Sequence, residues 1–226
     1  MAKITSINEA IALVKDGMTI MVGGFLGCGA PDKLMHALSL SGVKDLTVIC
    51  NDGGLPGGRL LGVQELIHDG QVKHLIATHI GMNKEVGQMM NEGTMKVTLV
   101  PQGSLAEKIR AGGYGLGGIL TPTGLGTPVG VGSEDAKGGE KESIVIDGKE
   151  FLLERPLRAD IAFIYGSVAD KYGNVKIHGT ARNFNTVMAT AADTVICQAD
   201  ELVEMIDPDE VLIQGVLVDY IVGGKN

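Results

Sequence analysis

One pattern repeats along the first half of this sequence: a short apolar run, a turn with glycine or proline, and an amphipathic stretch. The apolar runs occupy residues 19–22, 46–50, 72–78 and 97–100, and the amphipathic stretches occupy residues 31–40, 64–68, 84–91 and 104–111. The runs predict buried strands and the stretches predict helices. Four such cycles in succession favour right-handed crossovers. The predicted fold class is therefore α/β, with an open, mainly parallel sheet and helices on both faces.

The composition fits a sheet of this kind. Hydrophobic types make up 44% of the 226 residues, but aromatic types only 4%, and tryptophan is absent. The core must therefore be aliphatic, which suits a sheet that is buried on both faces. The 34 glycines indicate turns with positive φ angles, or backbone that approaches a ligand closely. Because no internal repeat or linker interrupts the chain, residues 1–226 are predicted to form one domain.

The pattern changes after the fourth cycle. Residues 112–141 combine many glycines with a polar stretch, which predicts a long loop that is functional or mobile. Residues 144–153 are typical of a hairpin, because an Asp-Gly pair divides two apolar runs. Ser6 and Glu9 match a capping box in front of another helix. Strands are further predicted at 160–167 and 195–198, and helices at 10–14 and 184–192.

Charge and cysteine content argue against several classes of function. The formal net charge is −8, from 19 Lys and Arg against 27 Asp and Glu, without a basic run. A nucleic-acid partner is not expected, because phosphate binding needs a basic face. Cys28, Cys50 and Cys197 lie far apart and the histidines lack ligand spacing, so neither a disulfide framework nor a metal site is expected. Without a signal core or an apolar run of ~18 residues, we expect a cytoplasmic protein that does not enter a membrane.

The loop after the first predicted strand is a candidate ligand site. It contains Gly23, Gly24, Gly27 and Gly29, and a helix is predicted to begin after it at Pro31. Amides of such a loop, beside a helix amino terminus, can stabilise a negative oxygen, and one donor of this kind lowers a barrier by ~3–4 kcal/mol. The same glycines equally suit a tight turn that only packs the helix on the strand. These residues alone leave both interpretations open.

A second glycine-rich segment carries less weight. Residues 113–118 match the spacing of the dinucleotide fingerprint literally. They follow a predicted helix instead of a strand, however, and Pro122 blocks the helix that the fingerprint requires. We therefore do not expect a nucleotide to bind there.

Residues 16–31, with their Gly-Gly-Phe core and Gly-x-Pro end, resemble the amino-terminal signature of family I coenzyme A transferases at every defined position. The likeness continues through segments 101–113, 121–127, 148–154 and 179–185, and so covers nearly the whole chain. It implies a fold related to that of sugar-phosphate isomerases. It also implies the α subunit of the two-chain enzymes that move CoA between acetate, acetoacetate, butyrate and similar acids.

The chemistry implied by the resemblance is ping-pong transfer through a glutamyl-CoA thioester. In this family the glutamate lies in a Ser-Glu-Asn-Gly motif of the β subunit, which the present chain lacks. Residues 133–136 read Ser-Glu-Asp-Ala, and Glu134 lies in a polar loop that is ill suited to hold a nucleophile at attack distance. The resemblance thus implies no catalytic residue here, activity only with a β subunit in an α2β2 assembly, and CoA or acyl-CoA as substrate instead of a permanent cofactor.

What the resemblance assigns to this chain is the oxyanion and substrate-binding wall of the site, formed by Gly23, Gly24, Phe25, Gly27, Asn51, Gln102 and Gly103. Asn51 and Gln102 follow two of the predicted strands, so their neutral amides are expected at the carboxyl edge of the sheet. A side chain at Gly24 is expected to fill the space of the acyl oxygen. Plainer alternatives are a turn for Asn51, a helix cap for Gln102 and a core position for Phe25. Arg182 and Asn183 also match a family position, and suit chain-to-chain contact or folding as well as substrate binding.

Two other functions stay open on these residues. A sugar-phosphate isomerase-like enzyme would need a carboxylate base and a basic phosphate clamp, and neither accompanies the glycine-rich loop. A non-catalytic acyl-CoA or carboxylate-binding module would keep the fold without the chemistry. A neighbouring gene that encodes Ser-Glu-Asn-Gly would favour the enzyme over the module.

Overall fold

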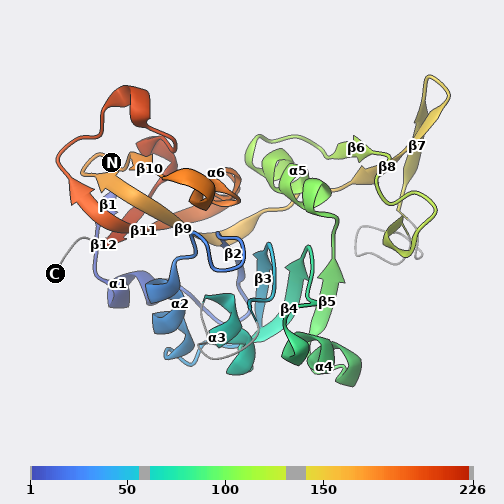
Figure 1. Cartoon of the computed structure of the whole chain (residues 1–226), viewed down its shortest axis with the longest axis horizontal. Coiled ribbons are helices and arrows are strands. Elements are labelled where there is room, and N and C mark those ends of the chain that lie inside the picture. The colour runs from blue at the N-terminus through green and yellow to red at the C-terminus, as the bar shows by residue number, and fades with distance from the viewer. Residues whose placement is uncertain (1, 56–61, 131–140, 224–226) are drawn as a thin grey trace.

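The computed structural model describes residues 2–55, 62–130 and 141–223 (Figure 1). Its main sheet has the strand order β1-β12-β11-β9-β2-β3-β4-β5, and neighbours along this path are parallel. These strands span Lys3–Ile4 (β1), Thr19–Val22 (β2), Leu46–Cys50 (β3), Val72–Ala77 (β4), Lys96–Leu99 (β5), Ala159–Asp170 (β9), Ala192–Val203 (β11) and Tyr220–Gly223 (β12). Val175–Lys176 (β10) pairs with β9 in the antiparallel direction. The expected open, mainly parallel sheet is confirmed.

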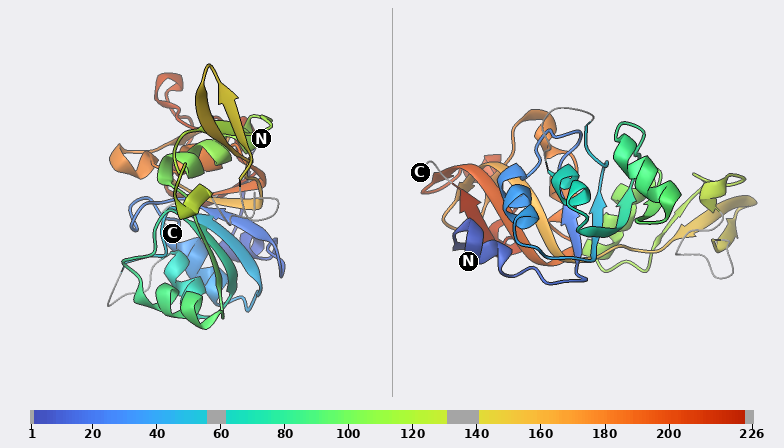
Figure 2. Two further views of the ribbon diagram at one scale, coloured as in Figure 1. Left: turned by 90° about the vertical axis from the view of Figure 1, so that its right-hand side faces the viewer. Right: turned by 90° about the horizontal axis from the view of Figure 1, so that it is seen from below.

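Helices cover both faces of this sheet, as expected. They span Ile7–Ile11 (α1), Asp32–Ser39 (α2), Val63–His68 (α3), Lys84–Glu92 (α4), Gln102–Gly113 (α5) and Asn185–Met188 (α6). Ile20 and Val22 point to the face of α1 to α4, and Met21 points to the face of α5 and α6. Because side chains alternate along a strand, the apolar run of β2 serves both cores. Figure 2 shows α2, α3 and α4 in a row across the strands.

A smaller antiparallel sheet extends from the main body (Figure 1). Its order is β6-β8-β7, with β6 at Ile119–Thr121, β7 at Ser143–Ile146 and β8 at Lys149–Glu154. The predicted hairpin is confirmed, because β7 and β8 join at the Asp-Gly turn. The prediction of a continuous loop over 112–141 is wrong at β6, which is too short to show a period in the sequence. Glu134 lies outside the described residues.

Two expectations for the last third of the chain need correction. The helix predicted over 184–192 is only the single turn α6, because β11 already begins at Ala192, which pairs with Ala159 of β9. β9 and β11 are confirmed but longer than predicted, since they pair along most of their length. At the amino terminus, the capping box of Ser6 and Glu9 is confirmed, but the helix predicted over 10–14 spans Ile7–Ile11 instead and begins directly after Ser6. In the described ranges, no helix combines the length and apolar character that a membrane crossing requires.

The topology changes direction at β2. From β2 the chain continues outward through β3, β4 and β5, whereas β9, the other neighbour of β2, comes much later in the sequence. In open parallel sheets, ligands bind at such a switch point, beyond the carboxyl ends of the strands. Residues 23–30, called the glycine loop below, lie at this position and lead into α2.

Candidate functional site

The glycine loop is a self-paired turn. Phe25 N donates to Cys28 O (3.1 Å) and Cys28 N donates to Phe25 O (2.9 Å) across it. Gly24, Gly27 and Gly29 have φ angles of +116°, +80° and +68°, which residues with a side chain rarely adopt. These three glycines are therefore required by the backbone geometry of the turn, whatever else they do.

Two amides of the glycine loop already have acceptors within the protein. Gly23 N donates to Phe163 O (2.9 Å), and Gly24 N donates to Asn183 Oδ1 (3.1 Å). A backbone amide carries one hydrogen, so neither group is open to a substrate oxygen in this conformation. The structure thus contradicts the expectation that the Gly23 and Gly24 amides form a ready anion site.

The space beside these two glycines is occupied as well. A Cβ atom at Gly23 would collide with Asn185 Oδ1, which accepts the Tyr165 amide (2.8 Å) and belongs to a fully buried side chain. A Cβ atom at Gly24 would lie 3.0 Å from Ala30 Cβ. A side chain at Gly24 would therefore press on the loop itself, and the expectation that it would fill the substrate's space stays a prediction.

Asn51 and Gln102 form a hydrogen-bonded amide pair at the carboxyl edge of the sheet. Asn51 follows β3 and is 1% exposed, whereas Gln102 is the exposed first residue of α5. Gln102 Nε2 donates to Asn51 Oδ1 over 2.7 Å, so the two amides, each expected at this edge, are bonded to one another. Gln102 is not a helix cap, because Pro101 occupies that position and no side chain caps α5.

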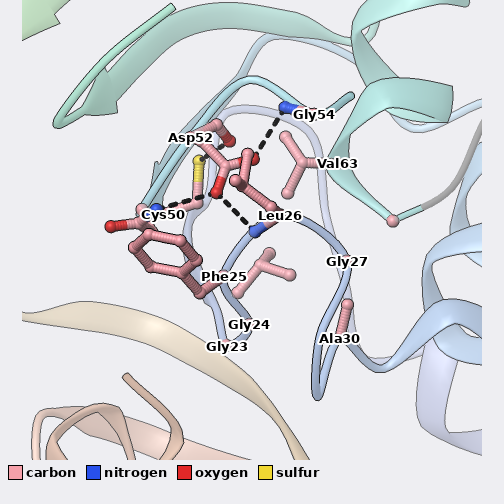
Figure 3. Close-up of a pocket in the computed structure, with 13 residues that line it drawn as sticks. Gly23, Gly24, Phe25, Leu26, Gly27, Ala30, Cys50, Asp52, Gly54 and Val63 are labelled. Atoms are coloured by element: carbon pink, nitrogen blue, oxygen red, sulfur yellow. Dashed lines mark hydrogen bonds between the residues drawn. The ribbon is translucent and has the colours of Figure 1, made fainter. Parts of the chain in front are cut away.

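Asp52 completes the site and was not among the expected residues. Its Oδ2 accepts hydrogen bonds from Leu26 N (2.9 Å) and Asn51 Nδ2 (2.8 Å), and its Oδ1 accepts one from Gly54 N (3.0 Å; Figure 3). The last contact is a local turn bond that Asn-Asp-Gly-Gly after a strand could have indicated. The contact with Leu26 joins two separate loops, and no local pattern reveals it.

The buried thiol beneath the site is not a nucleophile. Burial raises the pKa of the Cys50 thiol, and the negative charge of Asp52 raises it further. Cys50 Sγ also donates to Asp52 O over 3.2 Å. The thiol therefore stays protonated at neutral pH, and the reactive thiolate form is not populated.

Two hollows meet at Phe25. The smaller, about 30 Å³, lies among the glycine loop, Asn51 and Asp52, and has room for a water-sized group (Figure 3). The larger, about 380 Å³, has Phe25, Gln102, Gly103, Ala106, Asn183, Phe184 and Val187 around it. Phe25 lines both hollows and is 37% exposed, so the alternative of a core position is wrong. Every residue expected at the site lines at least one of the two.

Asn183, for which the sequence left several roles open, also bonds to the glycine loop. Its Oδ1 accepts Gly24 N, and its Nδ2 donates to Cys28 O (2.9 Å) and Thr180 O (3.0 Å). It therefore contributes to the folding of the loop. In the described part of the chain, no group of His, Cys, Asp or Glu side chains could hold a metal ion.

Comparisons with known proteins agree on one family. The sequence profile described as "Coenzyme A transferase" matches residues 4–224. The chain is 47% identical over 222 residues to the acetate CoA-transferase subunit alpha of Escherichia coli, which covers 97% of this chain and 96% of that protein. It is also 47% identical over 223 residues to the acetoacetyl-CoA:acetate/butyrate CoA transferase alpha subunit of Clostridium acetobutylicum, with 98% and 97% covered.

A solved structure shows the same fold. An acyl-CoA transferase of Escherichia coli O157:H7, in a thioester complex with CoA, superposes with a TM-score of 0.84 at 24% identity. The match covers 98% of this chain but only 47% of that one, so this chain corresponds to about half of the larger protein.

Proposed function

Because this chain belongs to the coenzyme A transferase family, we propose that it is the α subunit of a two-chain enzyme that transfers CoA between short-chain acyl-CoA and a carboxylic acid. The observation that carries the proposal is the neutral amide pair of Asn51 and Gln102. Gln102 lines the larger hollow, so the pair lies beside it. Acids of the acetate, acetoacetate or butyrate class are the proposed substrates, since the two relatives above are named for them.

We propose that the partner chain, a β subunit, supplies the attacking carboxylate. Its glutamate attacks the thioester carbonyl, which releases CoA thiolate and leaves an acyl-glutamyl anhydride. The thiolate then attacks the glutamyl carbonyl, so that the first acid departs and a glutamyl-CoA thioester forms. The second acid reverses these steps and leaves as its CoA ester, and the glutamate is regenerated. Asp52, the carboxylate that lines the smaller hollow, is held by its own hydrogen bonds and is not proposed as the nucleophile.

The role that we assign to this chain is to stabilise negative charge on the thioester oxygen. A side-chain amide nitrogen carries two hydrogens, so Gln102 Nε2 keeps a second donor beyond its bond to Asn51. The first-turn amides of α5 have no side-chain cap, and Gln102 and Gly103 line the larger hollow. The amide pair and this helix end thus replace the Gly23 and Gly24 amides as the proposed oxyanion donors.

We further propose that the acyl chain lies in the larger hollow. Ala106 of α5, Val187 of α6 and Phe184, which directly precedes α6, give it an apolar wall together with Phe25 of the glycine loop. Among the described residues, neither a lysine nor an arginine lines it, so the acyl chain, and not the charged part of CoA, fits this surface. A volume of about 380 Å³ leaves ample room for a short acyl group.

Co-expression with a candidate partner tests the proposal. The partner is a neighbouring gene product with a Ser-Glu-Asn-Gly motif, and the assay is CoA transfer from acetoacetyl-CoA to acetate and butyrate. We expect no turnover by this chain alone, turnover by an α2β2 complex, and a CoA adduct that borohydride or hydroxylamine locates on the partner. Turnover by the isolated chain, or an adduct on one of its carboxylates, would overturn the proposal. Acyl-CoA binding without any transfer by the complex would favour the binding module.

A further inference from the structure

Asp52 connects parts of the site that are otherwise separate. One of its carboxylate oxygens, Oδ2, accepts from the tip of the glycine loop at Leu26 N and from the side chain of Asn51. Asn51 in turn accepts from Gln102, so an unbroken set of hydrogen bonds runs from the glycine loop to the start of α5. Asp52 itself does not line the larger hollow.

We propose that Asp52 is a positioning residue, which orients the amide pair and the glycine loop together for CoA transfer. This inference rests on the proposed function, because it assigns Asp52 a task in that reaction. Asp52 does not touch the reacting atoms. It acts through Asn51 on one side and through Leu26 on the other.

The orientation of Asn51 follows from the chemistry of Asp52. An ionised carboxylate only accepts hydrogen bonds, so the side of Asn51 that faces it must be the nitrogen, Nδ2. The oxygen of Asn51 then faces Gln102, which must present its own nitrogen. Without a carboxylate at position 52, either the oxygen or the nitrogen of the Asn51 side chain could face that position. Gln102 Nε2 would then no longer have a fixed acceptor.

The same carboxylate also holds the tip of the glycine loop in place, through Leu26. Leu26 has a φ angle of +48°, a conformation that is unfavourable for a leucine and needs support from its surroundings. The support is the bond from Leu26 N to Asp52 Oδ2, 2.9 Å long, between groups 26 positions apart in the chain. Phe25, which lines both hollows, directly precedes Leu26. Loss of the bond from Leu26 to Asp52 therefore changes where the phenylalanine ring stands relative to the amide pair.

Two substitutions separate acceptor chemistry from size. Asp52→Leu keeps the branched arrangement of heavy atoms, in a larger side chain, and removes every acceptor, whereas Asp52→Asn keeps one oxygen that can still accept from Leu26 N and Asn51 Nδ2. In the complete complex we expect Asp52→Leu to lower kcat and kcat/KM equally, by about 100-fold, as for a misplaced catalytic group. Asp52→Asn should recover most of this loss but still lower kcat by about 3- to 10-fold, because its amide no longer dictates which end of the Asn51 amide faces it.

A matched control is Asn83, which bonds to the same turn from another segment of the chain. Asn83 Nδ2 donates to Gly53 O (2.7 Å) and so holds the turn from outside, but it forms no bond to Asn51 or Leu26. Asn83→Ala is expected to lower the melting temperature while kcat stays within 2-fold. A loss of kcat in Asn83→Ala as large as that in Asp52→Leu would show that only the folding of the turn matters, and would overturn the inference.

A double variant tests whether Asp52 acts through Asn51. If it does, Asp52→Leu should reduce kcat much less in an Asn51→Ala background than in the unaltered one. Fully additive losses would overturn this route. Should Asp52→Leu not assemble, Asp52→Asn decides alone: a fall in kcat at constant KM supports the inference, and an unchanged kcat refutes it. An unaltered complex without transfer activity would overturn the proposed function itself, whereas an active complex that tolerates Asp52→Leu would overturn only this inference.

Discussion

At the scale of single residues, the glycines of the site differ in what they do. A side chain at Gly23 would collide with buried Asn185, and Gly24 has a positive φ angle and a close neighbour in Ala30. A substitution at either position therefore disturbs the fold, so a loss of activity there would not report on the chemistry of the site. Gly103 is different, because a Cβ atom there meets nothing within 4 Å and its backbone is helical. It is the glycine of the site at which folding and activity can be separated.

The first prediction concerns Gly103→Ala. An alanine in a compatible helical position stabilises a protein by about 0.4–1 kcal/mol, so the melting temperature should be unchanged or higher. The added methyl group would enter the larger hollow, so transfer to butyrate should fall more than transfer to acetate. Gly87→Ala on α4 is the control, because it also meets open space on a helix but lies outside both hollows. If Gly103→Ala changed the rates of transfer to butyrate and to acetate by the same factor, Gly103 would not belong to the acyl site.

The second prediction concerns the exposed member of the amide pair. Gln102→Ala removes the bond to Asn51 Oδ1 and the proposed second donor, so kcat should fall by about 100-fold. Assembly with the partner and the melting temperature should be unaffected, because Gln102 is exposed and does not cap α5. Gln88→Ala, another exposed glutamine on a helix, should leave both the rate and the melting temperature unchanged. An unaltered rate in Gln102→Ala would remove this residue from the site.

At the scale of elements, a buried charge cluster fastens the small sheet to α5. Glu154 of β8 is fully buried, and its two oxygens accept from Lys108 of α5 (3.1 Å) and from Lys141 (2.5 Å). Both lysines are buried as well. Because Gln102 begins α5 and Lys108 lies in the middle of it, the cluster links the antiparallel sheet to the proposed site through one helix.

The third prediction is that Glu154→Gln destabilises the protein strongly. Removal of the carboxylate leaves buried ammonium groups without their shared anion, at a cost of about 3–5 kcal/mol. The free energy of unfolding in urea measures this loss. Glu150→Gln, on an exposed position of the same strand, should change it by no more than about 0.5 kcal/mol. Similar values for the two variants would show that the cluster contributes little.

The hairpin between β9 and β10 supplies a pH-dependent element. Burial alone would raise the pKa of Asp170, but hydrogen bonds from Asn174, Ile206 and Tyr172 outweigh it and lower the pKa below its ordinary value of 3.8. A lowered pKa in the folded state stabilises the fold above the ordinary value, and this contribution disappears as the pH falls below it.

The fourth prediction follows from that sign. At pH 7 Asp170→Asn should melt at a lower temperature than the unaltered protein. The difference should shrink as the pH is lowered from about 5 to about 3, because the unaltered protein then loses its advantage. Melting temperatures of both proteins across this range provide the test, and a difference that is constant with pH would contradict the assignment.

At the scale of the whole molecule, the two faces of the main sheet form the hydrophobic core, whereas its carboxyl edge carries the proposed site. Both faces are closed by helices, whereas the carboxyl edge near β2 carries the glycine loop, the amide pair and both hollows. A partner that supplies the nucleophile must therefore approach this edge and not the outer surface of α1 to α4.

The fifth prediction is a pattern of hydrogen exchange. On assembly with the proposed β subunit, amides of the glycine loop and of the first turn of α5 should exchange more slowly. Amides of the last turn of α4, a helix on the face of the main sheet opposite α5, should exchange as in the isolated chain. Protection confined to α4 would place the partner on the wrong surface for the proposed chemistry.

The sequence by itself determined the fold class, most of the strands and helices, and the family. Strands β2 and β3 and helix α2 follow from short-range patterns, namely apolar runs, glycine turns and a proline next to a helix start, because each is set by neighbours in the chain. The convergence of Asn51 and Gln102 was also predictable, since carboxyl ends of parallel strands share an edge.

Only the tertiary structure decided which groups of the site are free and which are engaged. The amides of Gly23 and Gly24 are already bonded to Phe163 and Asn183, which lie more than a hundred positions away in the chain. The bond from Leu26 to Asp52 likewise joins two loops that come together only when β2 and β3 pair. Hydrogen-bond partners of this kind depend on distances in space, whereas sequence patterns report only on neighbours along the chain.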